Sequence, residues 1–448
     1  MVLEHNVLDE EPRSVVVIGA GLSGLQAANR LSQHFPDIVV LEASSQIGGR
    51  IRQVDNVADW PVQLGPEFIH GAKSSLKRIL EEIGCQCQEY EWPDYWYFGN
   101  ERLLIRPGNQ DEDLQRVHEL FASVGKTAPP RTDISAMHWL KMQNANSRMV
   151  AIAEACYAND FGCSLDQLGL HEMITENQRW DSGDTYLVLD RCLSSIVEHL
   201  HSKLEGRTRT SWPVSCIEYS DGSATVHGPS GQRLRARHVI VTVPILALQN
   251  GSISFKPALP RAKGDAIARI RMSNAVKVIL AFSRPFWPAH FFDVVCTDCF
   301  IPEFWVTSYP ATAQDSSNLH SMVGFIAGKK AEDLSSMRHS NIILNALKQL
   351  DQIFGCQQVP RPATGAFVRG HVADWSKVPW IGGAYSYPTL GAHPGDRDAL
   401  AAPVGSVLFF AGEATHPAVN PCMQAALETG ERAAEQILAH QNAACSKL

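Results

Sequence analysis

The stretch from residue 13 to residue 50 constrains the fold more than any other part of the chain. It opens with an apolar, mostly β-branched run at 14–18, which predicts a buried strand. A helix is expected over 22–33 and a second strand over 38–42, with a Gly-x-Gly-x-x-Gly turn between the first strand and the helix. The sequence therefore predicts a β-α-β unit of the dinucleotide-binding type. The three glycines of its turn are Gly19, Gly21 and Gly24.

Each glycine of this turn has a physical task if a dinucleotide binds. Gly19 permits the tight turn, Gly21 lets a pyrophosphate approach the backbone, and Gly24 lets the helix pack closely on the strand. The phosphates would lie at the helix N-terminus, where free N–H groups favour negative charge. Glu42 ends the second strand at the spacing of a carboxylate that binds ribose hydroxyls. This combination favours binding over a glycine-rich turn without a ligand, but it does not separate NAD from FAD.

Two further segments point to the same ligand. Gly49 follows a second glycine and precedes Arg50, whose guanidinium can bind a pyrophosphate with two parallel hydrogen bonds. The segment 63–71 carries glycines near both ends, which is typical of a loop that approaches a ligand and then turns. His70 in this loop either touches substrate or is structural, and the sequence leaves both alternatives open.

Bulk properties restrict the function classes. A chain of 448 residues can bury a large core and is expected to hold two domains. The net charge of −8 argues against nucleic acid as the main partner and weakly favours a cationic substrate. The longest apolar run, near 239–248, contains a proline and is too short to span a membrane. No metal-ligand set is predicted.

Later segments add candidate site residues. Lys277 interrupts an apolar strand expected over 275–282, so it points either to solvent or into a functional cavity. Asp184 is a possible anchor for a substrate ammonium. Trp375 and the small and aromatic residues at 380–387 suit a wall against a flat ligand. The strand expected over 407–413 ends in Glu413, and a helix is expected over 422–439.

Taken together, these motifs resemble the flavin-containing amine oxidases, in the peroxisomal polyamine oxidase branch, over nearly the whole chain. The resemblance implies an α/β fold with a Rossmann-like FAD-binding domain and an inserted α+β substrate domain. The FAD domain would comprise 1–75, 205–255 and 370–448, and the substrate domain 76–204 and 256–369. The motifs that carry the resemblance are VVVIGAGLSGLQAA, VLEASSQIGGRI, LGPEFIHG, VIVTVP, KVILAFSRPFWP, GGAYSY and FFAGEATHPAVNPCMQAALETGERAA.

The resemblance also assigns roles residue by residue. Glu42 would hold the adenosine ribose, Arg50 the pyrophosphate and Glu413 the ribityl chain. Lys277 matches the family lysine that bonds through water to flavin N5, and His70 matches a histidine of the animal-type polyamine oxidases. The remaining cofactor contacts are expected from the loop Leu64, Gly65, Pro66, Glu67 and Phe68, from the backbone of Val214, from Trp375, and from Cys422 and Met423.

The chain departs from the family pattern at the substrate end. Ala384 stands where monoamine oxidases carry the cysteine that bonds to flavin, so FAD is expected to be noncovalent. Tyr385 matches one wall of the monoamine oxidase aromatic cage, whereas Cys422 replaces the second tyrosine. Both are expected to contact substrate, together with His70 and Asp184.

The resemblance implies oxidation of spermine, spermidine or their N-acetyl forms by O2, giving an amine, an aldehyde and H2O2. The alternatives are an L-amino-acid or other amine oxidase of the same fold, a histone-demethylase-like module, and a flavoprotein that no longer turns over. The sequence does not indicate the oligomeric state. The last three residues, Ser446-Lys447-Leu448, match the tripeptide read by the peroxisomal import receptor, so that receptor is an expected partner and the peroxisome the expected location.

Overall fold

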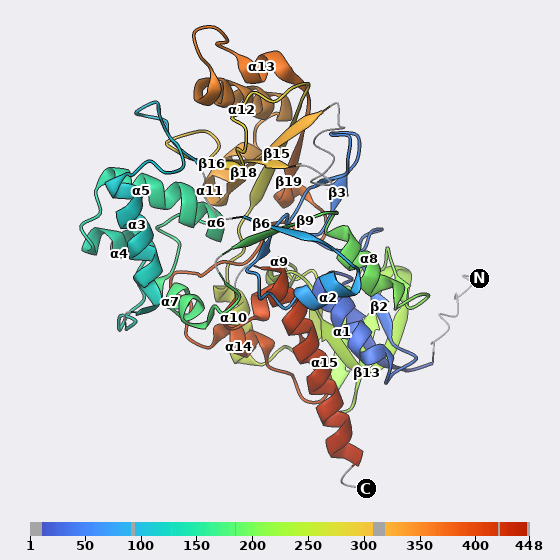
Figure 1. Ribbon diagram of the computed structural model, residues 1–448. Coiled ribbons are helices and arrows are strands. Elements are labelled where there is room, and N and C mark those ends of the chain that lie inside the picture. Colours follow the sequence, from blue (N-terminus) through green and yellow to red (C-terminus); the bar gives the residue numbers. More distant parts are fainter. Residues whose placement is uncertain are drawn as a thin grey trace.

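Two β-sheets organise the computed structural model, and each is covered by helices (Figure 1). The first sheet contains the predicted dinucleotide-binding unit. The second lies in the upper half of Figure 1, and the C-terminal helix runs away from it toward the bottom of the view. The structure describes residues 11–90, 95–126, 128–183, 185–307, 319–419 and 422–445.

The first sheet is eight-stranded, and β1 lies near its centre between two parallel neighbours. Ile18 of β1 is in register with Leu41 and with Val241, so the carboxyl ends of these three strands lie together. In parallel sheets of this kind ligands bind outside those ends. The strands are β1 (Arg13–Ile18), β2 (Val39–Leu41), β10 (Thr208–Arg209), β11 (Cys216–Ser220), β12 (Ser223–His227), β13 (Arg233–Val241), β14 (Ser254–Lys256) and β20 (Leu408–Phe410).

Alternation along β1 explains why this strand is apolar throughout. Val15 and Val17 pack under α1 (Leu22–Ser32) and α15 (Met423–Cys445), while Val16 and Ile18 pack into a second core on the opposite face. Burial on both faces is typical of a parallel strand. The two helices lie side by side in Figure 1.

The second sheet has seven strands, with β15 next to one edge. Every residue of β15 is buried, which is why this strand also reads as a continuous apolar run. The strands, in spatial order, are β19 (Phe367–Asp374), β15 (Ala275–Phe282), β18 (His320–Ala327), β17 (Glu303–Thr307), β16 (Asp293–Thr297), β7 (Tyr95–Phe98) and β8 (Leu103–Ile105).

Smaller elements connect the two sheets. Two short ladders comprise β3 (Gln53–Val54) with β4 (Val62–Gln63), and β9 (Tyr186–Leu189) between β5 (Ile69–His70) and β6 (Cys87–Tyr90). The remaining helices are α2 (Lys77–Glu82), α3 (Glu112–Ser123), α4 (Ala136–Met142), α5 (Ser147–Ala153), α6 (Asn159–Phe161), α7 (Leu170–Arg179), α8 (Ser194–Ser202), α9 (Ile245–Gln249), α10 (Arg261–Arg269), α11 (Gly328–Ser335), α12 (His339–Phe354), α13 (Pro362–Ala366) and α14 (Asp396–Ala401).

The elements agree with most sequence expectations, with differences at their ends. α15 continues to Cys445, beyond the expected end at 439. The domain boundary expected at 370 falls inside β19, which pairs with β15 in the second sheet. Among the described residues, no helix has both the length and the apolar character needed to cross a membrane.

Candidate active site

A cavity of about 1560 Å³ is lined by residues of both sheets and by the loops between them. A site for a drug-sized ligand occupies roughly 300–1,000 Å³, so this cavity can hold a large cofactor together with a substrate. It brings together nearly all of the predicted site residues, although Gly24 packs behind the turn and Asp184 lies outside the described residues. The predicted residues that line it are Gly19, Gly21, Glu42, Gly49, Arg50, Leu64, Gly65, Pro66, Glu67, Phe68, His70, Val214, Lys277, Trp375, Tyr385, Glu413, Cys422 and Met423.

The glycine turn leaves backbone exposed where phosphates would bind. Gly21 is the N-cap of α1 and makes no side-chain cap, so the first N–H groups of the helix face the cavity without a protein partner there. A Cβ on Gly24 would lie 2.0 Å from the carbonyl oxygen of Gly19, which explains why this position must be glycine. Gly49 has a φ of +59° and its added Cβ would lie 3.3 Å from Gly21 Cα. The turn therefore fits a pyrophosphate.

Glu42 is fixed at the end of β2. Its Oε2 accepts from the backbone N–H of Ala20 at 2.8 Å, and its Oε1 accepts from that of Ser44 at 2.9 Å. Each carboxylate oxygen keeps a second lone pair. Glu42 can therefore accept from ribose hydroxyls without moving, as the resemblance implies.

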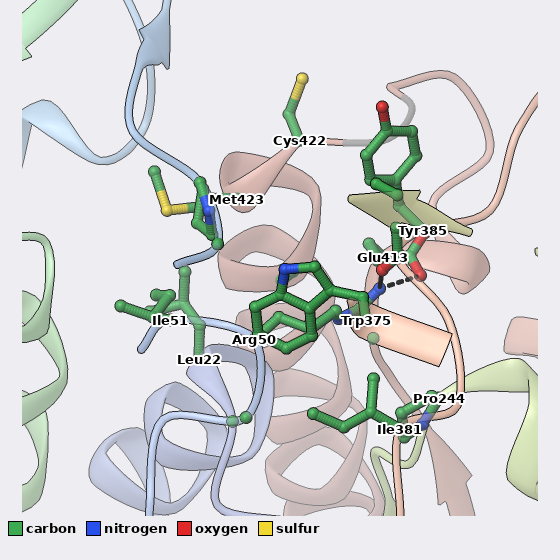
Figure 2. Close-up of a pocket in the computed structure, with 18 of the residues that line it drawn as sticks. Leu22, Arg50, Ile51, Pro244, Trp375, Ile381, Tyr385, Glu413, Cys422 and Met423 are labelled. Carbon is green, nitrogen blue, oxygen red and sulfur yellow. Dashed lines mark hydrogen bonds and ion pairs between the residues drawn. The ribbon is translucent and has the colours of Figure 1, made fainter. Parts of the chain in front are cut away.

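Arg50 is held by two groups from the C-terminal half of the chain. Its Nη1 donates to Glu413 Oε1 at 2.9 Å and to the carbonyl oxygen of Ala384 at 2.7 Å (Figure 2). Burial alone would raise the pKa of Glu413, but Arg50 and a hydrogen bond from Ser386 outweigh it and leave the pKa below its usual value. Glu413 is therefore ionised at neutral pH, and the other donors of Arg50 remain for a pyrophosphate.

The loop that would pass along the flavin ring is tightly packed. Trp375 Nε1 donates to the carbonyl oxygen of Leu64 at 2.9 Å. A Cβ on Gly65 would lie 1.9 Å from the carbonyl oxygen of Arg50. Figure 2 shows the Trp375 ring in the middle of the cavity wall, between Ile381 and Pro244 on one side and Tyr385 and Cys422 on the other. This arrangement fits a flat ring system.

The sequence left open whether Lys277 points to solvent or into a cavity. In the structure its side chain points into the cavity. Its side chain is 5% exposed, and its Nζ lies 2.8 Å from Oε2 of Glu67. The same Nζ lies 5.2 Å from the ring centroid of Trp305. The sequence assigned Glu67 only to the cofactor loop and missed its ion pair with Lys277, because the two residues are far apart in sequence.

The second sheet places an acid in the same cross-strand row as Lys277. Lys277 is in register with Phe325, and Phe325 is in register with Glu303 on the next strand. Residues in register share a face of a sheet, and all three line the cavity. Burial, then Asp160 and Asp293, raise the pKa of Glu303 well above its usual value, whereas Lys277 acts in the opposite direction.

Asp160 adds a second carboxylate on the same side as Glu303, since Nδ2 of the neighbouring Asn159 donates to Glu303 Oε2 at 3.4 Å. Asp160 lies in α6 and exposes its side chain to the cavity. Burial raises the pKa of Asp160, and His70 acts in the opposite direction. His70 lines the cavity too, and burial lowers its pKa, so it is neutral at pH 7. No sequence motif marks Asp160 or Glu303, and sequence reasoning missed both.

Tyr385 and Cys422 also line the part of the cavity that contains Asp160 and Glu303, which we call the chamber. The Tyr385 hydroxyl donates to the backbone carbonyl of Asp160 at 3.0 Å. The Tyr385 ring and the Cys422 side chain lie at the same end of the view in Figure 2. Their position at the acid-lined end agrees with the predicted substrate contacts, which stay predictions.

A different side-chain cluster lies on the first sheet, where no metal site was predicted. Ligand atoms of Cys216, Glu218 and His227 lie within 4.8 Å of one another. Lys256 Nζ lies 3.3 Å from Glu218 Oε1. The Lys256 ammonium therefore already compensates the charge of Glu218, the carboxylate that a metal cation would need at this cluster.

The fold and cavity define a class: a dinucleotide-binding protein whose cofactor cradle opens into a chamber that contains the acids Asp160 and Glu303. A model of the family of flavin containing amine oxidoreductases matches residues 22–438. The chain belongs to this family. Its cofactor is FAD, which the glycine turn, Glu42, Arg50 and Glu413 are arranged to hold.

Three known proteins illustrate the range of similarity. Human lysine-specific histone demethylase 2 is 26% identical over 96% of this chain, which spans 54% of that protein. Human peroxisomal N(1)-acetyl-spermine/spermidine oxidase is 26% identical over 95% of this chain and 94% of its own length. The structure of cyclohexylamine oxidase from Brevibacterium oxydans superposes with a TM-score of 0.84 at 20% identity, covering 96% of this chain and 100% of that one. The chain thus spans about half the length of the human and mouse lysine-specific histone demethylases that it matches.

Proposed function

We propose that the protein oxidises polyamines, namely spermine, spermidine or their N-acetyl forms, with O2 as the acceptor. The products would be an amine, an aldehyde and H2O2. The observation that carries this proposal is the pair of carboxylates, Asp160 and Glu303, in the chamber next to Lys277. Within the described part of the chain, neither forms an ion pair with a lysine or arginine.

Glu303 is buried and Asp160 is exposed to the cavity, and carboxylates that lack a cationic partner in such a place favour a ligand that supplies the missing charge. Desolvation disfavours their ionised forms, which is why both have a raised pKa. A polyamine carries further ammonium groups beyond the nitrogen that reacts. Binding such a group would restore the ionised carboxylate and form a charge-assisted hydrogen bond.

The residues of the chain then divide the work. Glu42, Arg50 and Glu413 would hold FAD, which would supply the two-electron oxidation of the carbon beside the reacting nitrogen. Asp160 and Glu303 hold the distal ammonium, and neutral His70 can exchange a hydrogen bond with the substrate chain. Lys277 orients water near the reacting end, as the resemblance implies. The apolar and aromatic walls, including Phe325 and Tyr385, exclude bulk water and cover the methylene groups.

A substrate panel tests this proposal. Purified protein is mixed anaerobically with spermine, spermidine, their acetyl forms, putrescine, cyclohexylamine, L-lysine and a methylated-lysine peptide. Loss of the yellow flavin absorbance and release of peroxide after adding air are recorded. We expect polyamines to have the highest kcat/KM. Preference for an amino acid or for the peptide would instead support an amino-acid oxidase or a demethylase-like activity. No bleaching by any amine would contradict turnover.

We also propose that the chain is imported into the peroxisome through Ser446-Lys447-Leu448, which lie outside the described residues. The support is the tripeptide itself. A fluorescent protein fused to the N-terminus should give a punctate signal that coincides with a peroxisomal marker. Deleting the three residues should make the signal diffuse, and a diffuse signal from the intact fusion would contradict the proposal.

A further inference from the structure

We propose that Glu67 is a positioning residue that fixes the ammonium of Lys277 and compensates its charge beside the flavin site. The inference rests on amine oxidation by this family and on the role that the resemblance gives Lys277. It does not depend on polyamine being the substrate, so the two proposals fail independently. The resemblance placed Glu67 only in the loop along the flavin ring.

Three groups surround the Lys277 ammonium. Glu67 Oε2 lies 2.8 Å away, and the carbonyl oxygen of Gln63 lies 3.5 Å away. The face of Trp305 lies 5.2 Å away. Of these, Glu67 makes the short contact and is the one that carries a full opposite charge. The ion pair is buried, with side-chain exposures of 5% for Lys277 and 4% for Glu67.

The loop that carries Glu67 has little freedom. Gly65 is pressed against the carbonyl of Arg50, and Leu64 accepts a hydrogen bond from Trp375. On the other side of Glu67, the Phe68 ring makes an edge contact with Trp305, with centroids 5.2 Å apart. The chain is therefore anchored on both sides of Glu67, and the contact with Lys277 holds the carboxylate in place.

Glu67 also determines which carboxylate pairs with the Lys277 ammonium. Glu303 lies in the same cross-strand row and is influenced by the charge of Lys277. Without Glu67, Glu303 would be the remaining acid for the ammonium in that row, and Lys277 would be drawn toward the substrate chamber. A lysine that must hold a water at the flavin gains a fixed position from Glu67, because a flexible four-carbon side chain has many alternatives.

The pairing has an electrostatic signature that a purely structural role lacks. Removing a negative charge near a redox group favours its reduced, more negative form, and removing a positive charge disfavours it. We therefore expect Glu67→Gln to shift the flavin midpoint potential to more positive values. Lys277→Met should shift it to more negative values, and the double variant should return close to wild type.

The experiment is a double-mutant cycle on the FAD-loaded protein. Midpoint potentials are measured without substrate, and stopped-flow rates are measured with whichever amine the wild type oxidises. Glu67→Gln keeps the volume and a hydrogen-bond acceptor. Because Lys277 would be misplaced, we expect the more strongly affected of the two half-reactions to slow on the order of 100-fold. In the Lys277→Met background the same change should alter the rate by no more than about twofold.

Two controls separate this role from general destabilisation. Glu67→Asp keeps the charge and should leave the midpoint potential near that of wild type. Glu431→Gln removes a carboxylate that pairs with Arg78 outside the cavity, and should change neither potential nor rate. Equal effects of Glu67→Gln with and without Lys277, or an unchanged midpoint potential in folded Glu67→Gln, would overturn the proposal.

Discussion

Replacing Lys277 by methionine is expected to slow flavin reduction, reoxidation or both by roughly 100- to 10,000-fold, the usual cost of losing a positioned proton-transfer group. Methionine keeps most of the volume but removes the charge and all three donors. The reason is the position of Lys277: its Nζ is buried in the cavity wall and bonded to Glu67. Stopped-flow absorbance, recorded separately for the anaerobic reaction with amine and for the reaction of reduced protein with O2, measures the effect.

The same substitution leaves Glu67 as a buried charge without its partner. Breaking a buried ion pair on one side typically costs about 3–5 kcal/mol of the free energy of unfolding. The double variant Lys277→Met/Glu67→Gln removes both charges and should recover most of that stability while staying slow. If both half-reactions of folded, FAD-loaded Lys277→Met proceed at the wild-type rate, Lys277 has a structural role in β15 and does not assist turnover.

Neutralising the acids of the chamber should weaken the use of polyamines selectively. A hydrogen bond to a charged group contributes about 1.5–3 kcal/mol, so Asp160→Asn or Glu303→Gln should lower kcat/KM for spermine or spermidine by roughly 10- to 150-fold. Most of the loss should appear in KM, because the distal ammonium takes no part in the chemical step. Steady-state peroxide assays measure it.

An alkyl monoamine of matched length provides an internal control, since it has no distal ammonium to lose. Its kcat/KM should change little in either variant. Glu154→Gln is a matched control variant: Glu154 is an acid just before α6 that does not line the cavity. Loss of monoamine and polyamine activity to the same degree in Asp160→Asn would show that Asp160 supports the fold and does not bind a cation.

The cofactor half of the molecule was largely predictable from the sequence, because its constraints are local. The glycine turn needs Gly19 and Gly24 within six residues of one another, and β1 and α1 have clear periodicity. Glu42 follows at a fixed distance. Arg50 could be assigned to a pyrophosphate, but its contacts with Ala384 and Glu413 could not, since they join segments more than 300 residues apart.

The substrate half was less predictable, for a physical reason. Glu303 reaches the cavity through the register of β17 with β18, and Asp160 through the packing of a one-turn helix. Neither register nor packing is marked by local motifs. The unusual position of Lys277 in an apolar strand was visible in the sequence, yet its partner Glu67 was not recognised. The role of Asp184 stays a prediction because it lies outside the described residues.

The cross-strand row from Lys277 through Phe325 to Glu303 fixes the distance between the lysine and the acid. Neighbouring strands lie about 4.8 Å apart, so the backbone positions of the lysine and the acid are separated by about 10 Å. That interval is set by the hydrogen bonds between β15, β18 and β17, and insertions in the surrounding loops leave it unchanged. Substrates that differ in the distance between their nitrogens would therefore meet a lysine and an acid at a spacing fixed by the sheet. A one-residue slip in the register of β17 would turn Glu303 to the opposite face and remove it from the cavity.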